Sequence, residues 1–237
     1  MKGFIILGLS VSSVLSAQTD STQIKEIQEV SFTRRLPVSK EIINVQKDLG
    51  SKNLGQDLPI LLKNQMSVVA TSDAGNGVGY TGFRIRGSAG TSINVMLNGV
   101  PYNDSESQGT FFVNIPDMAS SASQIVIQRG VGTSSNGTAS FGASVNILTK
   151  NPDEKPYVLG QFSAGSFNTM KTSFEAGSGK FLNNLFSVSA RYSTINSDGY
   201  IDRAFSKLNS YNINALFEKG NTKIRFLTFG GKEKTYQ

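Results

Sequence analysis

The last third of the chain alternates polar and apolar residues with a period of two. A strand turns successive side chains to opposite faces, so this pattern predicts strands with one apolar and one polar face. The segments match the ~9–11 residues that a tilted strand needs to cross a membrane. The apolar positions are Phe162, Ala164, Phe174, Ala176, Phe186, Val188, Ala190, Tyr192, Tyr211, Ile213, Ala215, Phe217, Ile224 and Phe226.

The connections between these segments alternate in length: short near residue 168, short at 180–184, long at 194–209 and short at 219–222. Transmembrane barrels have short turns on one side and longer loops on the other. With residue 157 on the periplasmic side, the long connection lies outside the cell. A soluble β-sandwich also alternates, but its strands average ~5–6 residues. Strand length and loop pattern therefore favour the transmembrane barrel.

Composition removes several other classes of protein. No apolar run near the ~20 residues of a spanning helix follows residue 16, so a membrane role would need strands. The chain has no Cys and no His, which excludes thiol nucleophiles, metal sites built on them and histidine-dependent triads. The net charge of +6 is spread without a basic stripe, which argues against nucleic acid. We expect no enzyme activity, no cofactor and no metal site.

Two short patterns that could suggest chemistry are better explained as loops. Residues 77–82 match G-x-G-x-x-G, but a strand pattern follows at 83–86, where a dinucleotide site needs a helix. Asp104 and Glu106 lie in a polar loop with no nearby basic residue, which favours solvated charges over acid–base catalysis.

The N-terminus has the pattern of an export signal. Lys2 precedes an apolar stretch from Phe4 to Leu15, and Ser16-Ala17 offers a small-residue cleavage site. We therefore predict a signal peptide over residues 1–17. The alternative is a buried N-terminal strand or helix.

Residues 18–40 form a polar arm that contains one short extended patch. Such a patch can add itself as a strand to the sheet edge of a partner. A disordered leader with incidental apolar residues fits the spacing equally well. The patch consists of Ile27, Gln28, Glu29, Val30, Ser31, Phe32 and Thr33.

Residues 41–150 read as a small mixed α/β domain. The leucines between Leu54 and Leu62 form a helical stripe, and Pro59 places the start of that helix around Gln56. Half of the chain's 24 glycines fall between residues 71 and 150 and separate short apolar runs. We predict strands at 83–86, 93–97, 124–129 and 145–149, a hairpin at Asn98-Gly99, and loops around 71–81 and 102–112.

Four ordered segments of this domain resemble the plug of TonB-dependent outer-membrane receptors. They are residues 82–87 (GFRIRG), 93–101 (INVMLNGVP), 124–130 (QIVIQRG) and 140–150 (SFGASVNILTK). The resemblance covers about residues 27–150 and implies an α+β plug, with a small mixed sheet and short helices, followed by a transmembrane β-barrel. Val131, Asn136 and Ala143 depart from the usual Pro, Tyr and Gly, which suggests a subfamily and prevents transfer of a ligand.

The resemblance also implies partners and roles. The patch at residues 27–33 is similar to the TonB box and would pair with the TonB protein. Arginines matching Arg86 and Arg129 form ion pairs with barrel glutamates in the family; ordinary surface charge is the alternative. Outer-membrane lipid would surround the barrel, and the ligand would be a ferric siderophore, haem, cobalamin or glycan. Candidate ligand contacts on the two plug loops are Asp73, Asn76, Tyr80, Tyr102, Asn103, Asp104, Glu106 and Gln108.

The predicted organisation is a signal peptide at 1–17, an arm with the TonB box at 18–40, the plug region at 41–150 and the start of a barrel at 151–237. The residues after 155 supply about five strands of ~10 residues, whereas the smallest bacterial barrels have ~8. We therefore expect an N-terminal part of an energy-coupled uptake receptor. A passive channel or ligand-binding β protein is the alternative. A signalling receptor would need an extra folded domain between Ala17 and Ile27, where few residues lie.

Overall fold

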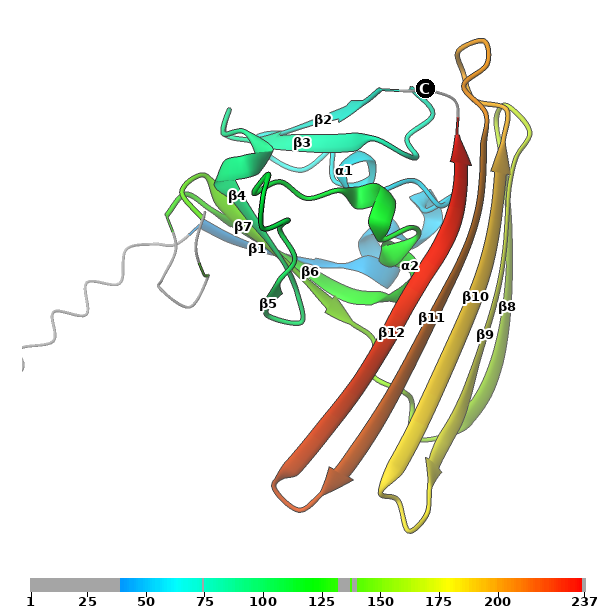
Figure 1. Cartoon of the computed structure of the whole chain (residues 1–237). Helices are drawn as coiled ribbons and strands as arrows, with labels where there is room; N and C mark the ends of the chain where they lie inside the picture. The colour runs from blue at the N-terminus through cyan, green and yellow to red at the C-terminus, as the bar shows by residue number, and fades with distance from the viewer. Residues whose placement is uncertain (1–38, 74, 132–136, 138–139, 236–237) are drawn as a thin grey trace, which may run out of the picture. The chain divides into compact units, whose positions relative to one another are not determined.

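The computed structural model describes residues 39–73, 75–131, 137 and 140–235. These described residues form one compact unit, which contains a mixed sheet with short helices and a sheet of long strands (Figure 1). The predicted signal peptide and the segment Ile27–Thr33 lie outside the described residues.

The plug region contains the predicted mixed sheet. Its strand order is β1-β6-β7-β4-β5, with β4 parallel to β7 and the other pairs antiparallel. The strands are β1 (Ser39–Asn44), β4 (Ile93–Leu97), β5 (Val100–Pro101), β6 (Ala122–Arg129) and β7 (Ala143–Thr149). Asn98 and Gly99 join β4 to β5 with φ values of 53° and 84°, the left-handed conformation that a tight hairpin turn requires.

A second, two-stranded sheet pairs β2 (Val68–Ser72) with β3 (Thr81–Ile85). Short helical segments complete the plug region: η1 (Val45–Leu49), η2 (Gly50–Lys52), α1 (Leu58–Leu61), η3 (Gly90–Ser92), η4 (Phe112–Asn114) and α2 (Met118–Ser121). The observed helix α1 is shorter than the helix that the leucine stripe predicts. Asp57 is extended with ψ 155°, so α1 begins only at Leu58, with Pro59 in its first turn.

One apolar core holds the plug region together. Ile93, Ile125, Ile127 and Ile147 of the mixed sheet are at most 1% exposed, and they share this core with the α1 leucines. Burying each such side chain contributes roughly 1.5–3 kcal/mol. The core fixes the positions of the loops that leave it.

Five antiparallel strands, which we call the strand wall, follow the plug region in simple up-and-down order. They are β8 (Pro156–Gly165), β9 (Thr169–Phe181), β10 (Phe186–Ser197), β11 (Ser206–Lys219) and β12 (Thr222–Thr235). Short turns join β9 to β10 and β11 to β12 at one end of the wall, as predicted, and a longer loop at residues 198–205 joins β10 to β11 at the other (Figure 1). This loop is shorter than the predicted 194–209 because both strands extend into that range.

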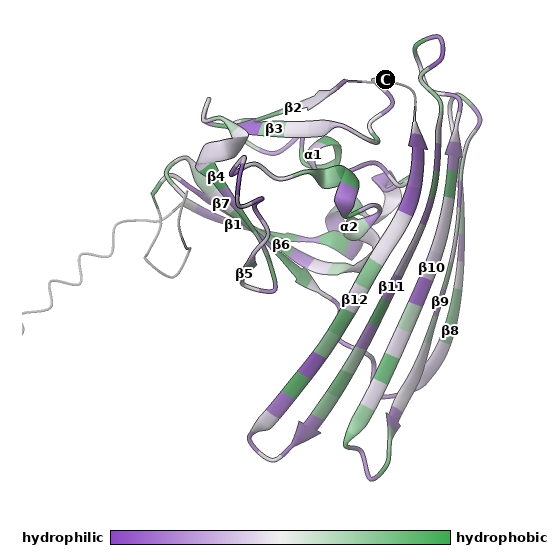
Figure 2. Ribbon diagram, in the orientation of Figure 1, coloured by the Kyte–Doolittle hydropathy of each residue, from purple (hydrophilic) through white to green (hydrophobic). Residues whose placement is uncertain are grey.

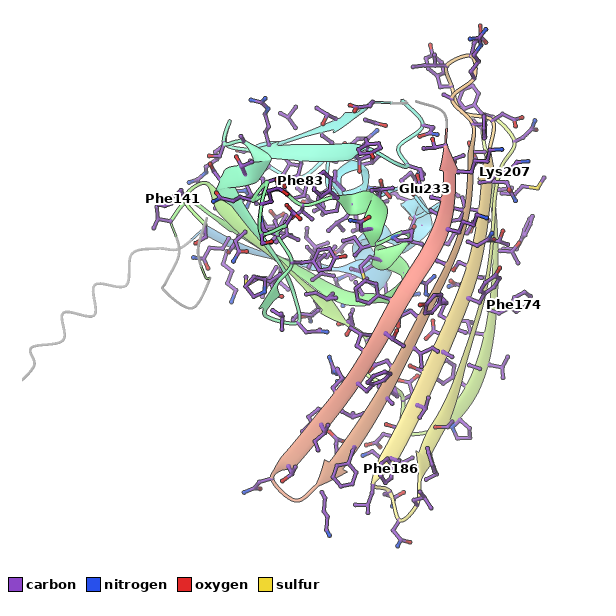
Figure 3. All side chains as sticks on the ribbon, in the orientation of Figure 1. Phe83, Phe141, Phe174, Phe186, Lys207 and Glu233 are labelled. Carbon is purple, nitrogen blue, oxygen red and sulfur yellow. The ribbon has the colours of Figure 1, made fainter. Side chains whose placement is uncertain are left out.

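The two faces of the strand wall differ as the alternation predicts. Phe174 is 61% exposed and projects away from the plug region (Figure 3), and Phe226 is 63% exposed. Hydrophobic and hydrophilic residues follow one another along these strands (Figure 2). Ser173, Ser193 and Asn214 project toward the plug region and are buried. The sheet is open, and the result is a partial barrel with a polar inner face. Within the described ranges, no helix has the length and apolar character needed to span a membrane.

Candidate functional site

A buried ion cluster joins the plug region to the inner face of the strand wall. Its centre is Asp117, the residue that precedes α2, whose side chain is fully buried. Asp117 Oδ1 accepts a hydrogen bond from Lys171 Nζ of β9 at 2.8 Å, and Asp117 Oδ2 accepts one from Arg191 Nη1 of β10 at 2.5 Å. One carboxylate of the plug region thus serves two cations of the wall.

Neutral groups complete the hydrogen bonds of the two cations. Lys171 Nζ also donates to Asn53 Oδ1 at 3.2 Å and to Ser120 Oγ at 2.6 Å. Arg191 Nε donates to Ser121 Oγ at 2.9 Å, and its Nη2 donates to the Asp117 carbonyl at 3.1 Å. The wall therefore contacts the residues around α2 through several charge-assisted hydrogen bonds, which are stronger than neutral ones.

The electrostatics of the cluster depend on Asp117 being ionised. Burial by itself would raise the pKa of Asp117, but the charges of Arg191 and Lys171 outweigh burial and hold that pKa below its ordinary value. Removing one partner of such a buried group leaves an uncompensated charge, which costs about 3–5 kcal/mol. The cluster is therefore a strong but breakable contact.

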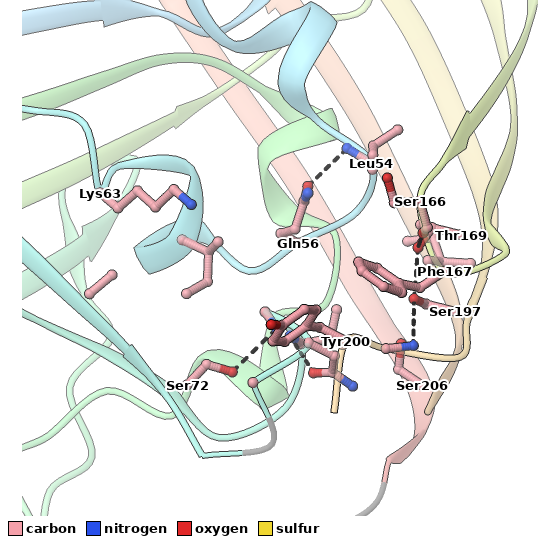
Figure 4. A pocket seen from close by; sticks show the side chains of 18 residues that line it. Leu54, Gln56, Lys63, Ser72, Ser166, Phe167, Thr169, Ser197, Tyr200 and Ser206 are labelled. Atoms are coloured by element: carbon pink, nitrogen blue, oxygen red, sulfur yellow. Dashed lines mark hydrogen bonds between the residues drawn. The ribbon is translucent and has the colours of Figure 1, made fainter. Parts of the chain in front are cut away.

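A cavity of about 550 Å³ lies near the end of the wall that carries the 198–205 loop (Figure 4). This size falls within the ~300–1,000 Å³ of small-molecule sites. The plug region lines it with Gln56, Lys63 and the loop at residues 75–78, and the wall lines it with hydroxyl groups and two aromatic rings. The rings of Phe167 and Tyr200 meet edge to face at 5.4 Å. Among the described residues of this lining, Lys63 alone has a charged side chain.

The first predicted ligand loop reaches this cavity. Asn76 lines it and donates from Nδ2 to the Ala204 carbonyl at 3.0 Å, which joins the plug loop to the 198–205 loop. Asp73 and Tyr80 are exposed at the base of the same loop and do not line the cavity.

The second predicted ligand loop lies at a different cavity, of about 590 Å³, lined by Asn103, Asp104 and Gln108 but by no residue of the strand wall. Asn103 Oδ1 accepts from Val95 N at 2.8 Å, and Asp104 Oδ1 accepts from Ser107 N at 2.7 Å, which lowers the pKa of Asp104. These side chains therefore also stabilise the loop itself.

The two other predicted contacts of that loop, Tyr102 and Glu106, lie outside this cavity lining. The Tyr102 ring packs against Phe229 of β12, with centroids 6.3 Å apart, and Glu106 is exposed. The two predicted ligand loops thus do not converge on one cavity.

The predicted arginines lie within the plug region. Arg129 forms an ion pair with Glu41 of β1 and donates from Nε to the Met66 carbonyl at 3.1 Å, whereas Arg86 is exposed. Their pairing with barrel glutamates stays a prediction.

Sequence reasoning missed the cluster of Asp117, Lys171 and Arg191. The available signal was the pair of basic residues at inward positions of the alternation, because a cation inside a filled barrel needs a partner.

A second buried carboxylate, Asp57, lies beside the cavity lining. Asp57 is 3% exposed, and burial raises its pKa to about 7, despite a hydrogen bond from Thr81 Oγ1 at 2.8 Å. Among the residues that the structure describes, no three Asp, Glu, Cys or His side chains converge as a metal site.

Comparisons with known proteins agree with this architecture. Residues 33–144 match the family described as the TonB-dependent Receptor Plug Domain. No curated protein matches the chain. Solved structures with the same fold include the siderophore receptor PirA from Acinetobacter baumannii (15% identity, TM-score 0.61), to which 82% of this chain aligns.

Two further similar structures are the ferric yersiniabactin uptake receptor FyuA from Yersinia pestis (14% identity, TM-score 0.63) and the copper transporter OprC (14% identity, TM-score 0.65). They align with 81% and 82% of this chain. The chain spans 31% of the length of each of these three proteins.

Proposed function

Because residues 33–144 match the TonB-dependent receptor plug family, we propose that this chain forms the plug and the first barrel strands of a receptor for energy-coupled uptake of a scarce ligand. The ion cluster around Asp117 carries this proposal. It binds the plug to the polar inner face of a wall whose outer face is apolar. A plug that fills a barrel must be both firmly seated and releasable, and a few charged contacts meet both needs.

The proposed location is the outer membrane, where the apolar face of the wall would contact lipid. Residues 1–17 would direct export and would be removed. Residues 18–40 would form the arm that reaches TonB, with Ile27–Thr33 adding a strand to its sheet. Residues 41–150 would act as the plug and residues 151–237 as barrel strands. A ligand transporter with these parts needs no catalytic residue of its own.

We propose that the ligand contacts the cavity between the loop at residues 75–78 and the wall residues Phe167 and Tyr200. Support comes from its size, from its aromatic pair and from its many hydroxyl and amide groups. PirA and FyuA are siderophore receptors by name, and OprC is a copper transporter. A metal chelate is therefore the first ligand class to test, followed by cobalamin, haem and glycans.

The proposed mechanism uses the ion cluster as the contact that pulling must break. Force applied through the arm would separate Asp117 from Lys171 and Arg191, which lie on different strands of the wall. In a low-dielectric interior the separated charges attract strongly until water enters. Water entry would lower this attraction and would open a path along the polar face of the wall.

Deletion of residues 27–33 from the full-length receptor tests the proposal. We expect ligand uptake to stop while ligand binding to intact cells is unchanged, because the arm transmits energy and does not contact ligand. Deletion of residues 18–24 has the same length, spares the patch and serves as the control. Uptake that continues after the first deletion would establish the passive channel instead.

A further inference from the structure

Two carboxylates from different parts of the molecule lie beside Gly79 of the plug loop. The Gly79 amide donates a hydrogen bond to the carboxylate of Asp57. A Cβ atom on Gly79 would lie 3.2 Å from Oε1 of Glu233. Figure 3 shows Glu233 on the side of β12 that faces the plug. Gly79 therefore lies close to an acidic group of the plug and to an acidic group of the wall.

Three carboxylate oxygens at this place are buried and have no hydrogen-bond partner among the residues described. They are Oδ1 of Asp57 and both oxygens of Glu233. The residue Asp57 is only 3% exposed. Buried polar atoms in proteins nearly always have partners, so three such oxygens together require an explanation.

Among the residues that the structure describes, no basic side chain compensates the two acids. The charged neighbour acting on Glu233 is Asp57, and the one acting on Asp57 is Asp117. Lys232 and Lys234 flank Glu233 in β12 and are exposed. Because successive strand residues project to opposite faces, both lysines point away from the plug.

Burying carboxylates without a counter-charge is costly, and proteins compensate it by pairing or by metal coordination. The donor atoms here are carboxylate oxygens, which hard divalent cations prefer. Because Gly79 has no side chain, its backbone can lie close to Glu233, where an added Cβ would be crowded.

We propose that Asp57 and Glu233 together bind a hard divalent cation, Ca²⁺ or Mg²⁺, between the plug and β12. Water would complete the coordination shell, as is common for Mg²⁺ and permitted for Ca²⁺. The cation would join the plug to the wall at a point separate from the Asp117 cluster, which uses β9 and β10.

The test uses the full-length receptor in detergent after treatment with EDTA and dialysis. Calorimetric titration with CaCl₂ and, separately, MgCl₂ should show that Asp57→Asn and Glu233→Gln each bind one equivalent less than the wild type. Asp104→Asn changes an exposed carboxylate whose oxygen is bonded within its own loop, and it should bind as the wild type does. The cation that produces the difference identifies the occupant.

Thermal stability gives a second and independent readout. In EDTA, Glu233→Gln should have a higher Tm than the wild type, because it removes a buried charge. In saturating cation the order should reverse, because only the wild type gains binding energy. Equal cation binding by wild type and both variants would overturn the proposal, as would a Tm order that is the same in both conditions. Either result would leave the proposed uptake function untouched.

Discussion

The plug region and the strand wall obey the same alternation but bury opposite faces. In β6 and β7 the buried side chains include Ile125, Ile127 and Val145, which pack in an apolar core. In β9 and β10 the buried side chains include Ser173 and Ser193, whose hydroxyl groups bond to each other at 2.9 Å. Alternation therefore identifies strands, but it does not show whether the polar or the apolar face is buried.

The difference lies in what covers each buried face. The plug sheet is covered by its own apolar helices, so the hydrophobic effect stabilises it directly. The polar face of the wall is covered by another part of the chain, which must supply hydrogen bonds and counter-charges. The plug should therefore depend on packing, and its attachment to the wall should depend on a few charged groups.

The strongest test of this division is Asp117→Asn in the full-length receptor. The substitution keeps the shape of the side chain but leaves Lys171 and Arg191 buried without a counter-charge. We expect a loss of about 3–5 kcal/mol in the stability of the plug within the barrel. Denaturant unfolding followed by protease accessibility of the plug measures this loss.

The pH dependence of the same variant supplies its control. Because its two cations hold the pKa of Asp117 below its ordinary 3.8, the stabilisation is fully present above pH 3.8 and is lost as the pH falls through the folded-state pKa. The stability difference between wild type and Asp117→Asn should thus be constant from neutral pH down to pH 3.8 and should shrink at lower pH. A constant difference at all pH values would show that packing, and not charge, seats the plug.

Apolar residues in the plug core and on the outer face of the wall should contribute differently to the free energy of unfolding. Ile125→Ala in the plug core removes a side chain that is 0% exposed and should cost about 2–5 kcal/mol through lost burial and a cavity. Ile213→Ala on the outer face of β11 removes one that is 38% exposed, and detergent fills the space, so about 1 kcal/mol is expected. Thermal unfolding in detergent compares them. Equal costs would mean that the outer face packs against protein, which would contradict its assignment to lipid.

Sequence reasoning predicted most of the fold because the fold depends on local patterns. Strand β4 was predicted at its observed bounds, and the outward set from Phe162 to Phe226 follows from a period of two. The α1 helix was predicted too long, because a leucine stripe shows which residues are buried but not where the backbone becomes extended.

The candidate site was harder to predict, since its contacts join residues far apart in sequence. Asp117 lies 54 positions from Lys171 and 74 from Arg191, so no local pattern links them. The loops at residues 73–80 and 102–108 look alike as polar segments. Only the tertiary structure shows that the first meets the wall, whereas the cavity of the second has no wall residue in its lining.

The smallest predicted effect concerns the turns, where the plug and the wall should not differ. Gly99 and Gly220 each lie in a tight turn, with positive φ values of 84° and 55°. An added Cβ would meet no atom within 4 Å at either position. Replacement by Val should therefore cost about 1–2 kcal/mol through backbone conformation alone.

The wall offers a matched rescue of the Gly220 substitution. Asn184 already adopts a φ of 63° in the neighbouring short turn, close to the value at Gly220. Because Asn tolerates this conformation, Gly220→Asn should be nearly neutral while Gly220→Val is not. Chemical unfolding of both variants, beside Gly99→Val in the plug, decides whether turn geometry is independent of what covers the sheet. A much larger cost at Gly99 than at Gly220 would mean that the apolar plug core constrains its turns as well as its faces.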